Sequence, residues 1–307
     1  MENSDFAFHP KVVVLILSYN GKYLLEEAIG SYLANDYPNY EVVVIDNGSR
    51  DGTSQYVETS WPQVQVIRTE KNLGYSGGAN FGLQHAFEQR KADYVLFTNN
   101  DVRADDKIIQ ALVKTAISDE RIGFTIGKVY YYDKPNVLHT VGKRYDEFRW
   151  NGGHIGRNET DTGQYDKVEE RDWCDDIYWL INKKVYFEIG GYDTEFFLQG
   201  EDYDYQARAR KAGYKIYYTP EAKLWHMTSK TIGRGSAYVE YFNSRNSLIV
   251  QMKHRPKEKY LPFIKAKRSE LVKLTPTYIS RLRFHFVYRM WLGYYSALQW
   301  GKRNNKL

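Results

Sequence analysis

The chain has 307 residues, of which 42% are hydrophobic and 26% are charged. This composition excludes a disordered protein and is typical of a globular protein with a sizeable core. The single cysteine, Cys174, excludes a disulfide within the chain and predicts a reducing compartment, the cytoplasm. Neither a secretory signal nor an apolar run long enough to span a bilayer is expected.

Charge is divided unevenly along the chain. The net charge is +5, but residues 253–307 hold 14 basic residues against only Glu258 and Glu270. Residues 1–252 are therefore acidic on balance. A basic tail on an acidic body is typical of a protein that contacts an anionic partner, either a membrane surface or nucleic acid.

Apolar runs and helical patterns alternate through the first third of the chain. The expected strands are 12–17, 41–45, 64–67 and 94–98, and the expected helices are 22–34, 53–59 and 76–90. Strands that alternate with helices predict βαβ units and a parallel sheet. The sequence therefore predicts an α/β fold.

Polar turns follow three of these strands at the point where each strand ends. They are Ser18-Tyr19-Asn20, Asp46-Asn47-Gly48-Ser49 and Asn99-Asn100-Asp101. Open α/β sheets bind ligands just beyond the carboxyl ends of their strands. A carboxylate among amides suits a divalent cation that carries a diphosphate, because hard metals take oxygen ligands. The alternative is a set of ordinary Asn/Asp turns.

Short motifs occupy residues 11–230 in a defined order. They are Ile45-Asp46-Asn47-Gly48-Ser49, Asp51-Gly52-Thr53, Asn72-Leu73-Gly74, Asn99-Asn100-Asp101, Gly190-Gly191-Tyr192-Asp193, Gly200-Glu201-Asp202-Tyr203-Asp204, Lys211-Ala212-Gly213-Tyr214 and Leu224-Trp225-His226. In order and spacing they resemble the family 2 glycosyltransferases. These are inverting enzymes with the GT-A fold, a mostly parallel central sheet flanked by helices with a Rossmann-like nucleotide-binding half. The Asn-Asn-Asp form of the family's Asp-x-Asp motif resembles its rhamnosyltransferase branch.

The resemblance implies that the first two turns hold the nucleotide. Asp46 would accept the N–H of a pyrimidine base. Ser18, Asn20 and Asn72 would make further contacts. The alternative for Asp46 is a turn residue that bonds its own backbone.

The resemblance also implies a metal at the diphosphate. Asp101 would bind Mn²⁺ or Mg²⁺ together with His226, which follows a strand at 214–218 and a turn at 219–220. Asn99 and Asn100 would lie near the ribose or the diphosphate. Asn99 replaces the acidic residue common in the family, which leaves one carboxylate for the metal. The alternative for His226 is a packed, hydrogen-bonded residue.

Asp202 and Glu201 open an expected helix that ends near Lys211. By resemblance, Asp202 is the general base against the acceptor hydroxyl, and Glu201 supports it. An inverting displacement needs one carboxylate on the face opposite the leaving group. The alternative is that these acids only complement the helix dipole.

The stretch before the expected helix at 183–189 departs from the family, which has small residues there. Asp175 and Asp176 are candidates for contacts with acceptor hydroxyls. Trp173 and Trp179 are candidates for stacking on an apolar sugar face. The alternative is that all four residues cap and pack. Residues 151–170 are expected to form a loop near the acceptor.

We therefore expect two domains. Residues 1–230 form the GT-A catalytic domain, with a nucleotide-sugar half at about 11–130 and an acceptor half at about 131–230. Residues 231–307 form a basic, aromatic-rich helical extension. Aromatic bulk beside cationic anchors predicts binding to an anionic membrane surface, at the inner face of the cell membrane. The alternatives are packing on the catalytic domain and a homodimer; nucleic acid is disfavoured by the acidic body.

The expected activity is metal-dependent, inverting transfer of a sugar from a nucleoside-diphosphate donor. The donor is a dTDP- or UDP-sugar, with dTDP-L-rhamnose as one candidate, and the acceptor is a carbohydrate or a lipid-linked glycan in cell-surface polysaccharide assembly. An NAD-dependent oxidoreductase is disfavoured because G-x-G-x-x-G is missing after the first strand. A sugar-binding protein without activity is the other alternative, and the joint presence of Asp101, Asp202 and His226 argues against it.

Overall fold

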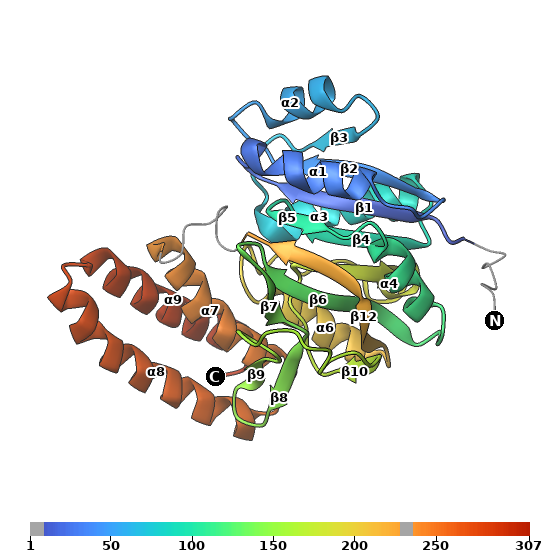
Figure 1. Cartoon of the computed structure of the whole chain (residues 1–307). Helices are drawn as coiled ribbons and strands as arrows, with labels where there is room; N and C mark the ends of the chain where they lie inside the picture. Colours follow the sequence, from blue (N-terminus) through green and yellow to red (C-terminus); the bar gives the residue numbers. More distant parts are fainter. Residues whose placement is uncertain (1–8, 228–235) are drawn as a thin grey trace.

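The computed structural model describes residues 9–227 and 236–307 (Figure 1). Its strands are β1 (Val12–Ser18), β2 (Tyr40–Asp46), β3 (Gln65–Arg68), β4 (Tyr94–Asn99), β5 (Val102–Ala104), β6 (Ile122–Tyr131), β7 (Lys134–Thr140), β8 (Lys143–Asp146), β9 (Trp150–His154), β10 (Glu169–Arg171), β11 (Tyr178–Asn182) and β12 (Lys215–His226). Its helices are the 3-10 turn η1 (Lys22–Leu24), α1 (Leu25–Leu33), α2 (Thr53–Ser60), α3 (Gly74–Gln84), the π-helical turn η2 (His85–Gln89), α4 (Ile108–Ala116), α5 (Lys183–Ile189), α6 (Glu201–Lys211), α7 (Ala237–His254), α8 (Lys257–Ser280) and α9 (Phe284–Arg303).

One ten-stranded sheet organises the catalytic part of the chain. Its order is β10-β12-β6-β11-β4-β1-β2-β3, with β5 paired to β12 and β7 paired to β6. β1 is parallel to β2 and β4, β3 is parallel to β2, and β12 is parallel to β6. β11 lies antiparallel between β4 and β6. The mostly parallel α/β sheet is confirmed. Because β11 pairs with both β4 and β6, the sheet runs through both the expected nucleotide-sugar half and the expected acceptor half.

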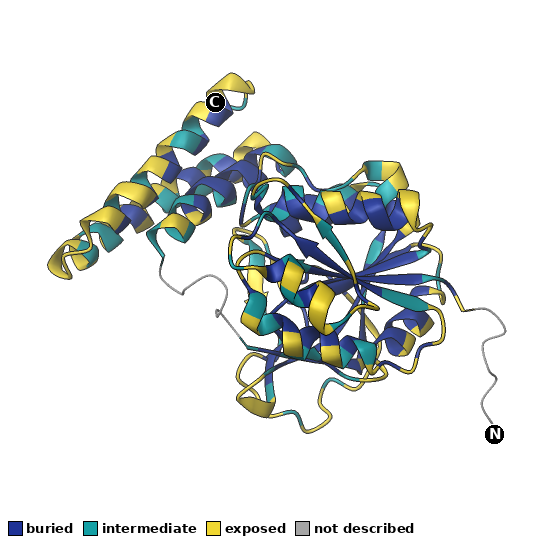
Figure 2. Cartoon of the chain, turned by 90° about the horizontal axis from the view of Figure 1, so that it is seen from above, coloured by how far each residue is buried: buried dark blue, intermediate teal, exposed yellow. Residues whose placement is uncertain are grey.

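The central strands are buried on both faces, which explains their continuous apolar runs. Val12, Val14 and Ile16 of β1 face a core that α1, α2 and α4 cover. Val13 and Leu15 face a second core under α3, α5 and α6, because successive side chains of a strand point to opposite faces. Seen from above, the buried strands lie between helices whose outer faces are exposed (Figure 2).

One helix was expected at 76–90, but the structure has an α-helix with other bounds, followed by a π-helical turn. α3 begins at Gly74, and after Gln84 the chain continues as the π-helical turn η2. Gly74 has a φ of +75°, and a Cβ there would lie 2.4 Å from the backbone oxygen of Phe197. The start of α3 therefore requires glycine, both for its dihedral and for the close approach.

The expected turn at 219–220 is also wrong, because β12 runs unbroken from Lys215 to His226. Its pairing with β6 shifts register between Tyr218 and Lys223. Pro220 lies inside this irregular stretch, where its missing N–H interrupts no regular ladder. The expected loop at 151–170 is interrupted as well, since it contains most of β9 and the start of β10.

The C-terminal extension is helical, as predicted, and the boundary expected at 230/231 lies outside the described residues. α7, α8 and α9 surround an apolar core of their own, to which the catalytic domain adds Phe196. α7 also docks on the catalytic domain, where the Asn246 amide donates to the backbone oxygens of Leu198, at 2.9 Å, and Gln199, at 2.7 Å. No helix in residues 9–227 and 236–307 is long and apolar enough to cross a membrane.

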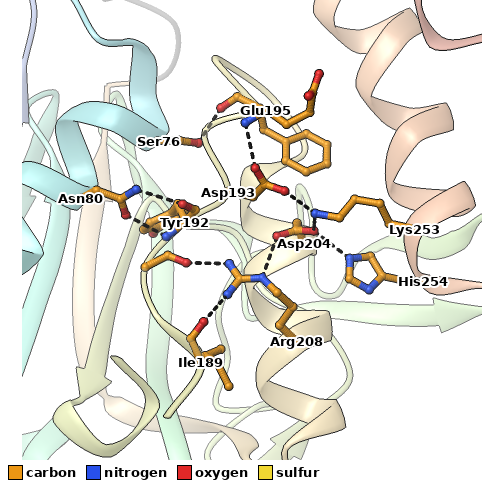
Figure 3. A network of polar contacts seen from close by, with 12 residues as sticks. Ser76, Asn80, Ile189, Tyr192, Asp193, Glu195, Asp204, Arg208, Lys253 and His254 are labelled. Carbon is orange, nitrogen blue, oxygen red and sulfur yellow. Dashed lines mark hydrogen bonds and ion pairs between the residues drawn. The ribbon is translucent and has the colours of Figure 1, made fainter. Parts of the chain in front are cut away.

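A buried polar network fastens the end of α7 to α6 (Figure 3). The carboxylate of Asp204 has no solvent exposure and lies 2.6 Å from Lys253 Nζ and 2.8 Å from His254 Nε2. Arg208 Nε donates to the same carboxylate at 2.9 Å. Burial alone would raise the pKa of Asp204, but bonds from His254 and Lys253 and the charges around it bring that pKa below its ordinary value. The extension is thus held to the helix that carries Asp202.

Candidate active site

The sheet brings the three predicted polar turns to one edge. In the β1/β2 pairing Ser18 lies opposite Asp46, and in the β1/β4 pairing Leu17 lies opposite Asn99. The Asn100 amide donates to Ser18 Oγ at 3.1 Å, which joins the first turn to the third. This alignment follows from parallel pairing, because the carboxyl ends of parallel neighbouring strands lie at the same edge of the sheet.

The carboxylate of Asp46 is fully buried and already has protein partners. Arg68 Nη1, from the end of β3, lies 2.6 Å away, and the Ser49 amide donates to the carboxylate at 2.8 Å. The Ser54 hydroxyl also donates to it. Sequence analysis missed Arg68, because no motif contains it. Recognition of a base by Asp46 stays a prediction beside this structural role.

Asn20 and Asn72 tie the surrounding loops together. The side-chain oxygen of Asn20 accepts the backbone N–H of Arg50 at 2.8 Å, and the backbone N–H of Asn20 donates to Ser49 Oγ at 2.9 Å. The Asn72 carbonyl accepts the Gly74 amide at 2.8 Å, at the start of α3. Both side chains therefore shape the loops above the sheet, and their contacts to a donor remain predictions.

Asp101 and His226 meet at the end of the sheet. The antiparallel pairing of β12 with β5 places His226 opposite Val102, and His226 Nε2 then lies 3.2 Å from Asp101 Oδ1. Both side chains are buried, and the other ring nitrogen of His226 has no hydrogen-bond partner. The expected pair thus comes together through β5 and β12, two strands that are far apart in the sequence.

The geometry of this pair fits a divalent cation. Octahedral Mg²⁺ binds its ligands at about 2.1 Å, so neighbouring ligand atoms lie about 3.0 Å apart. A carboxylate with an imidazole also suits Mn²⁺. No group of three or more His, Cys, Asp or Glu side chains in the described chain is arranged to hold a metal. Asp101 and His226 would therefore supply only part of the shell, with diphosphate and water oxygens completing it.

Asp202 and Glu201 lie at the first turn of α6, on the wall of a cavity of about 1090 Å³. Gly200, with a φ of +89°, ends the preceding loop and lets α6 start there. Asp175 and Asp176 line the same wall, although they precede β11 in the sequence. The next residue, Ile177, accepts the amide of Asn99 at 3.0 Å, so the cavity borders the end of β4.

Burial and mutual repulsion raise the pKa values of three carboxyl groups in this cluster. Burial, followed by the charges of neighbouring carboxylates, raises the pKa of Asp176 and Glu201 well above the ordinary value. Burial raises the pKa of Asp202 to about 6, while the nearby ammonium of Lys143 opposes the rise. Asp202 is therefore the member of this set best suited to accept a proton near neutral pH.

Lys143 is a residue of this site that sequence analysis missed. It is buried, its Nζ donates to Tyr203 Oη at 2.6 Å, and it pairs with Asp175. His154 Nδ1 lies 3.0 Å from the other oxygen of Asp175. Burial would raise the pKa of Asp175, but Lys143 and His154 bring it below the ordinary value. Asp175 is thus an ionised structural partner of Lys143 in this wall.

Trp173 and Trp179 are not placed to stack on a sugar, which corrects that expectation. Trp179 has no solvent exposure and stacks on Phe124 in the core, with ring centroids 4.8 Å apart. Trp173 is 3% exposed and is covered by Trp150 and Tyr203. Phe148, Tyr203 and Phe263 line the cavity with exposed or partly exposed rings, and so does Trp150. Its neighbours in sequence are polar, and only the fold brings it there.

The helical extension forms the other wall of the cavity. Phe242 and Asn246 of α7 and Phe263, Lys267 and Lys273 of α8 line it. The cavity is therefore acidic on the catalytic side and partly apolar on the helical side, where Glu270 also lines it and pairs with Lys267 at 3.0 Å, which leaves Lys273 as the cation without an ion pair to a described residue. Nothing in the local sequence of the tail showed that it would complete this site.

The comparison with known proteins decides the family. Glycosyl transferase family 2 matches residues 13–186, more than half of the chain. The chain belongs to glycosyl transferase family 2. It is therefore a glycosyltransferase, and a nucleotide-sugar donor and a glycan acceptor follow from membership of this family.

Two relatives illustrate the range of the family. The N-acetylglucosaminyl-diphospho-decaprenol L-rhamnosyltransferase of Mycobacterium tuberculosis is 28% identical over 243 residues, which are 73% of this chain and 78% of the relative. The poly-beta-1,6-N-acetyl-D-glucosamine synthase of Staphylococcus aureus is 23% identical over 224 residues, 72% of this chain and 51% of the relative.

Solved structures confirm the GT-A fold of this family 2 chain. GalNAc-T7 with UDP, GalNAc and Mn²⁺ has a TM-score of 0.63 at 16% identity, over 80% of this chain and 48% of that chain. The mannosyltransferase PcManGT of Pyrobaculum calidifontis, in complex with GDP-Man and Mn²⁺, has a TM-score of 0.56 at 16% identity, over 95% of this chain and 87% of that chain.

Proposed function

We propose that this family 2 glycosyltransferase is an inverting, metal-dependent enzyme with Asp202 as its general base. The observation that carries the proposal is the position of Asp202, which is buried in the cavity wall and has a pKa raised to about 6. Such a carboxylate is ionised at neutral pH and still basic enough to take a proton from an attacking hydroxyl. Lys143 lies close enough to help keep it ionised.

The reaction is a single displacement. The acceptor hydroxyl attacks the anomeric carbon of the donor, the bond from that carbon to the diphosphate breaks, and the hydroxyl proton passes to Asp202. The new bond forms on the face opposite the leaving group, so the configuration inverts. Asp101 and His226 would hold a Mn²⁺ or Mg²⁺ ion, which neutralises charge on the leaving diphosphate. Ser18, Asn20, Asp46, Asn72, Asn99 and Asn100 would bind the rest of the donor.

We assign the cavity to the acceptor. Trp150 offers a partly exposed ring for a sugar face, and Asp176 and Glu201 offer carboxyl groups for its hydroxyls. The helical wall, with Phe263 and Lys273, suits an acceptor that carries both an anionic and an apolar group. A lipid-linked glycan has both. The mycobacterial relative, an N-acetylglucosaminyl-diphospho-decaprenol L-rhamnosyltransferase, supports this choice and supports L-rhamnose as the donor sugar.

A donor panel with Mn²⁺ tests this proposal. The panel comprises dTDP-L-rhamnose, UDP-N-acetylglucosamine and GDP-mannose, with thermal stabilisation as the readout, because a ligand of the folded state raises its melting temperature. The donor that stabilises the protein is then offered with a lipid-linked and a water-soluble acceptor. Asp202→Asn should lower transfer by about 10²- to 10⁴-fold while donor stabilisation stays unchanged. Turnover by this variant within about tenfold of wild type would show that Asp202 is not the base.

A further inference from the structure

α9 has two apolar faces, and only one of them is covered. Phe286, Met290, Tyr294, Ala297 and Trp300 are buried against the other helices of the extension. The opposite stripe is exposed to solvent and consists of Phe284 (58% exposed), Tyr288 (63%), Leu292 (37%) and Tyr295 (55%). These four residues are spaced 4, 4 and 3 apart, so they lie on one side of the helix. A surface helix of a globular protein normally carries polar residues on that side.

The turn between α8 and α9 continues this stripe. Leu282 is 77% exposed, and among the described large hydrophobic side chains only Tyr23 is more exposed. Leu282 also has a φ of +55°, which is unusual for a residue with a branched side chain. Ile279, in the last turn of α8, is 45% exposed. A contiguous exposed apolar surface of this kind marks an interaction site.

Every charged residue that follows Glu270 in the sequence, and so every charged residue of α9 and of the α8–α9 turn, is basic. Glu270 is the last acidic residue of the chain, and the basic residues after it are Lys273, Arg281, Arg283, Arg289, Lys302, Arg303 and Lys306. None of these seven forms an ion pair with a described residue. Arg281 and Arg283 flank Leu282 directly. The surface therefore joins exposed aliphatic and aromatic groups to cations that form no ion pair with a described residue, and Glu240 of α7 is an acid that lies near it, beside Tyr278.

We propose that the exposed stripe of α9 and the α8–α9 turn dock this enzyme on an anionic membrane surface. Aromatic and aliphatic side chains enter the boundary between headgroups and acyl chains, while arginine and lysine bind the anionic headgroups. A second copy of the chain fits this surface less well, because a symmetric contact would bring two sets of unpaired arginines together. The turn lies at the end of the helical extension away from the sheet, where a flat surface can reach it (Figure 1).

The position of the α8–α9 turn also bears on how a lipid-linked acceptor reaches the cavity. This step rests on the proposed function. α8 lines the cavity as far as Lys273 and continues to Ser280, about 10 Å further along the helix at 1.5 Å per residue, and Leu282 lies in the turn that follows. A glycan whose lipid is anchored in the same bilayer could thus reach the cavity along α8. Docking would present the cavity to lipid-linked acceptors rather than to acceptors in solution.

The test is co-sedimentation of the full chain with vesicles. The probes are vesicles of phosphatidylcholine alone and vesicles with added phosphatidylglycerol. The wild type should sediment with the anionic vesicles, and less so as salt rises, because salt screens the headgroup charge. Leu282→Ser with Phe284→Ser, and separately Arg281→Gln with Arg283→Gln, should each lower partitioning by about tenfold or more.

Matched controls separate this surface from general effects. Phe187→Ser removes an aromatic ring of α5 that is 62% exposed, close to the exposure of Phe284. Arg121→Gln with Lys211→Gln removes two exposed cations from the catalytic domain. Both controls should partition within about twofold of wild type, and every variant should keep its helical circular dichroism. The replaced residues of the α8–α9 turn and the start of α9 are all exposed, so their replacement should leave folding intact.

Three outcomes would overturn the proposal. The first is equal sedimentation of the wild type with neutral and anionic vesicles, and the second is sedimentation with neither. The third is that the Leu282/Phe284 and Arg281/Arg283 double variants partition into vesicles as much as their controls do. A concentration-dependent dimer that Leu282→Ser with Phe284→Ser abolishes, without vesicle binding, would instead show an interface between copies. Asp202→Asn should lose transfer yet sediment like the wild type, so failure of the proposed chemistry and failure of docking are distinguishable.

Discussion

His226 Nε2 lies 3.2 Å from Asp101 Oδ1, although the two residues are far apart in the sequence. β12 is the last strand of the sheet in sequence, and its pairing with β5 brings His226 beside the turn that follows β4. Both groups are buried, and both can bind a divalent cation. The relationship makes the expected metal dependence testable residue by residue.

Asp101→Ala and His226→Ala should each raise the Mn²⁺ concentration needed for donor binding by about tenfold or more, because each removes a ligand of the metal. Calorimetric titration of the donor at several metal concentrations measures this. His85→Ala is the control, since His85 is buried and bonded to Gln65 and Gln89 away from this edge. Undiminished donor binding and transfer in excess chelator would contradict a metal-dependent enzyme.

The rate should depend on pH through Asp202. The raised pKa of about 6 means that this carboxylate is ionised above pH 6 and becomes protonated as the pH falls through 6. A protonated Asp202 accepts no proton, so kcat/KM should fall about tenfold for each pH unit below 6. A kcat/KM that stays constant from pH 7 to about pH 4.5 would exclude Asp202 as the titrating base.

Lys143→Gln should move this acid limb to higher pH, because the ammonium of Lys143 lowers the pKa of Asp202. Lys128→Gln is the matched control, since Lys128 is also a buried lysine that pairs with aspartates, Asp161 and Asp166. Both variants lose a buried ion pair and should lose stability. Only Lys143→Gln should shift the pH profile, and a shift in neither variant would contradict its electrostatic role.

Trp150→Ala should raise the KM for the acceptor by about two- to tenfold, which corresponds to about 0.5–1.5 kcal/mol for one aromatic contact. The KM for the donor should not change, because Trp150 lines the cavity and not the strand ends. Initial rates with each substrate varied in turn measure both constants. Trp61→Ala is the control, since Trp61 packs beside α2. An equal rise in both KM values would show a structural effect only.

Lys253→Met should lower the free energy of unfolding by about 1–3 kcal/mol, because it leaves part of the charge of buried Asp204 without a partner. His254 and Arg208 still bind Asp204, which limits the loss. Lys259→Met is the control, since its partner Glu147 is exposed and solvent screens such surface pairs, which therefore contribute little to stability. Urea unfolding measures both, and equal losses would contradict a structural clamp.

The same network predicts how stability depends on acidity. The pKa of Asp204 is lower in the folded protein than its ordinary value of about 4. Its contribution to stability is therefore fully present above about pH 4 and is lost as the pH falls toward the folded pKa. In Lys253→Met this acid-dependent loss should be smaller, since less of the contribution remains to lose.

The sequence by itself determined the family and the parallel strands β1 to β4 of the sheet. Continuous apolar runs such as Val12–Leu17 encode strands buried on both faces, and the polar residues after them encode the turns at their ends. Parallel pairing then brings Ser18, Asp46 and Asn99 to one edge of the sheet, because the carboxyl ends of parallel strands lie at the same edge. The start of α6 at Glu201 also follows from local signals, since acids in the first turn complement the helix dipole.

Only the tertiary structure decided how distant segments complete the cavity. The pairing of β11 with β4 and β6 brings Asp175 and Asp176 to the wall that carries Asp202, and it buries Trp179 in the core. Lys143 and Trp150 belong to no motif, and α8 adds a wall from far along the chain. Local periodicity and turn chemistry depend on neighbouring residues, whereas these contacts depend on packing summed over the whole domain. That sum is not readable from any single stretch of the sequence.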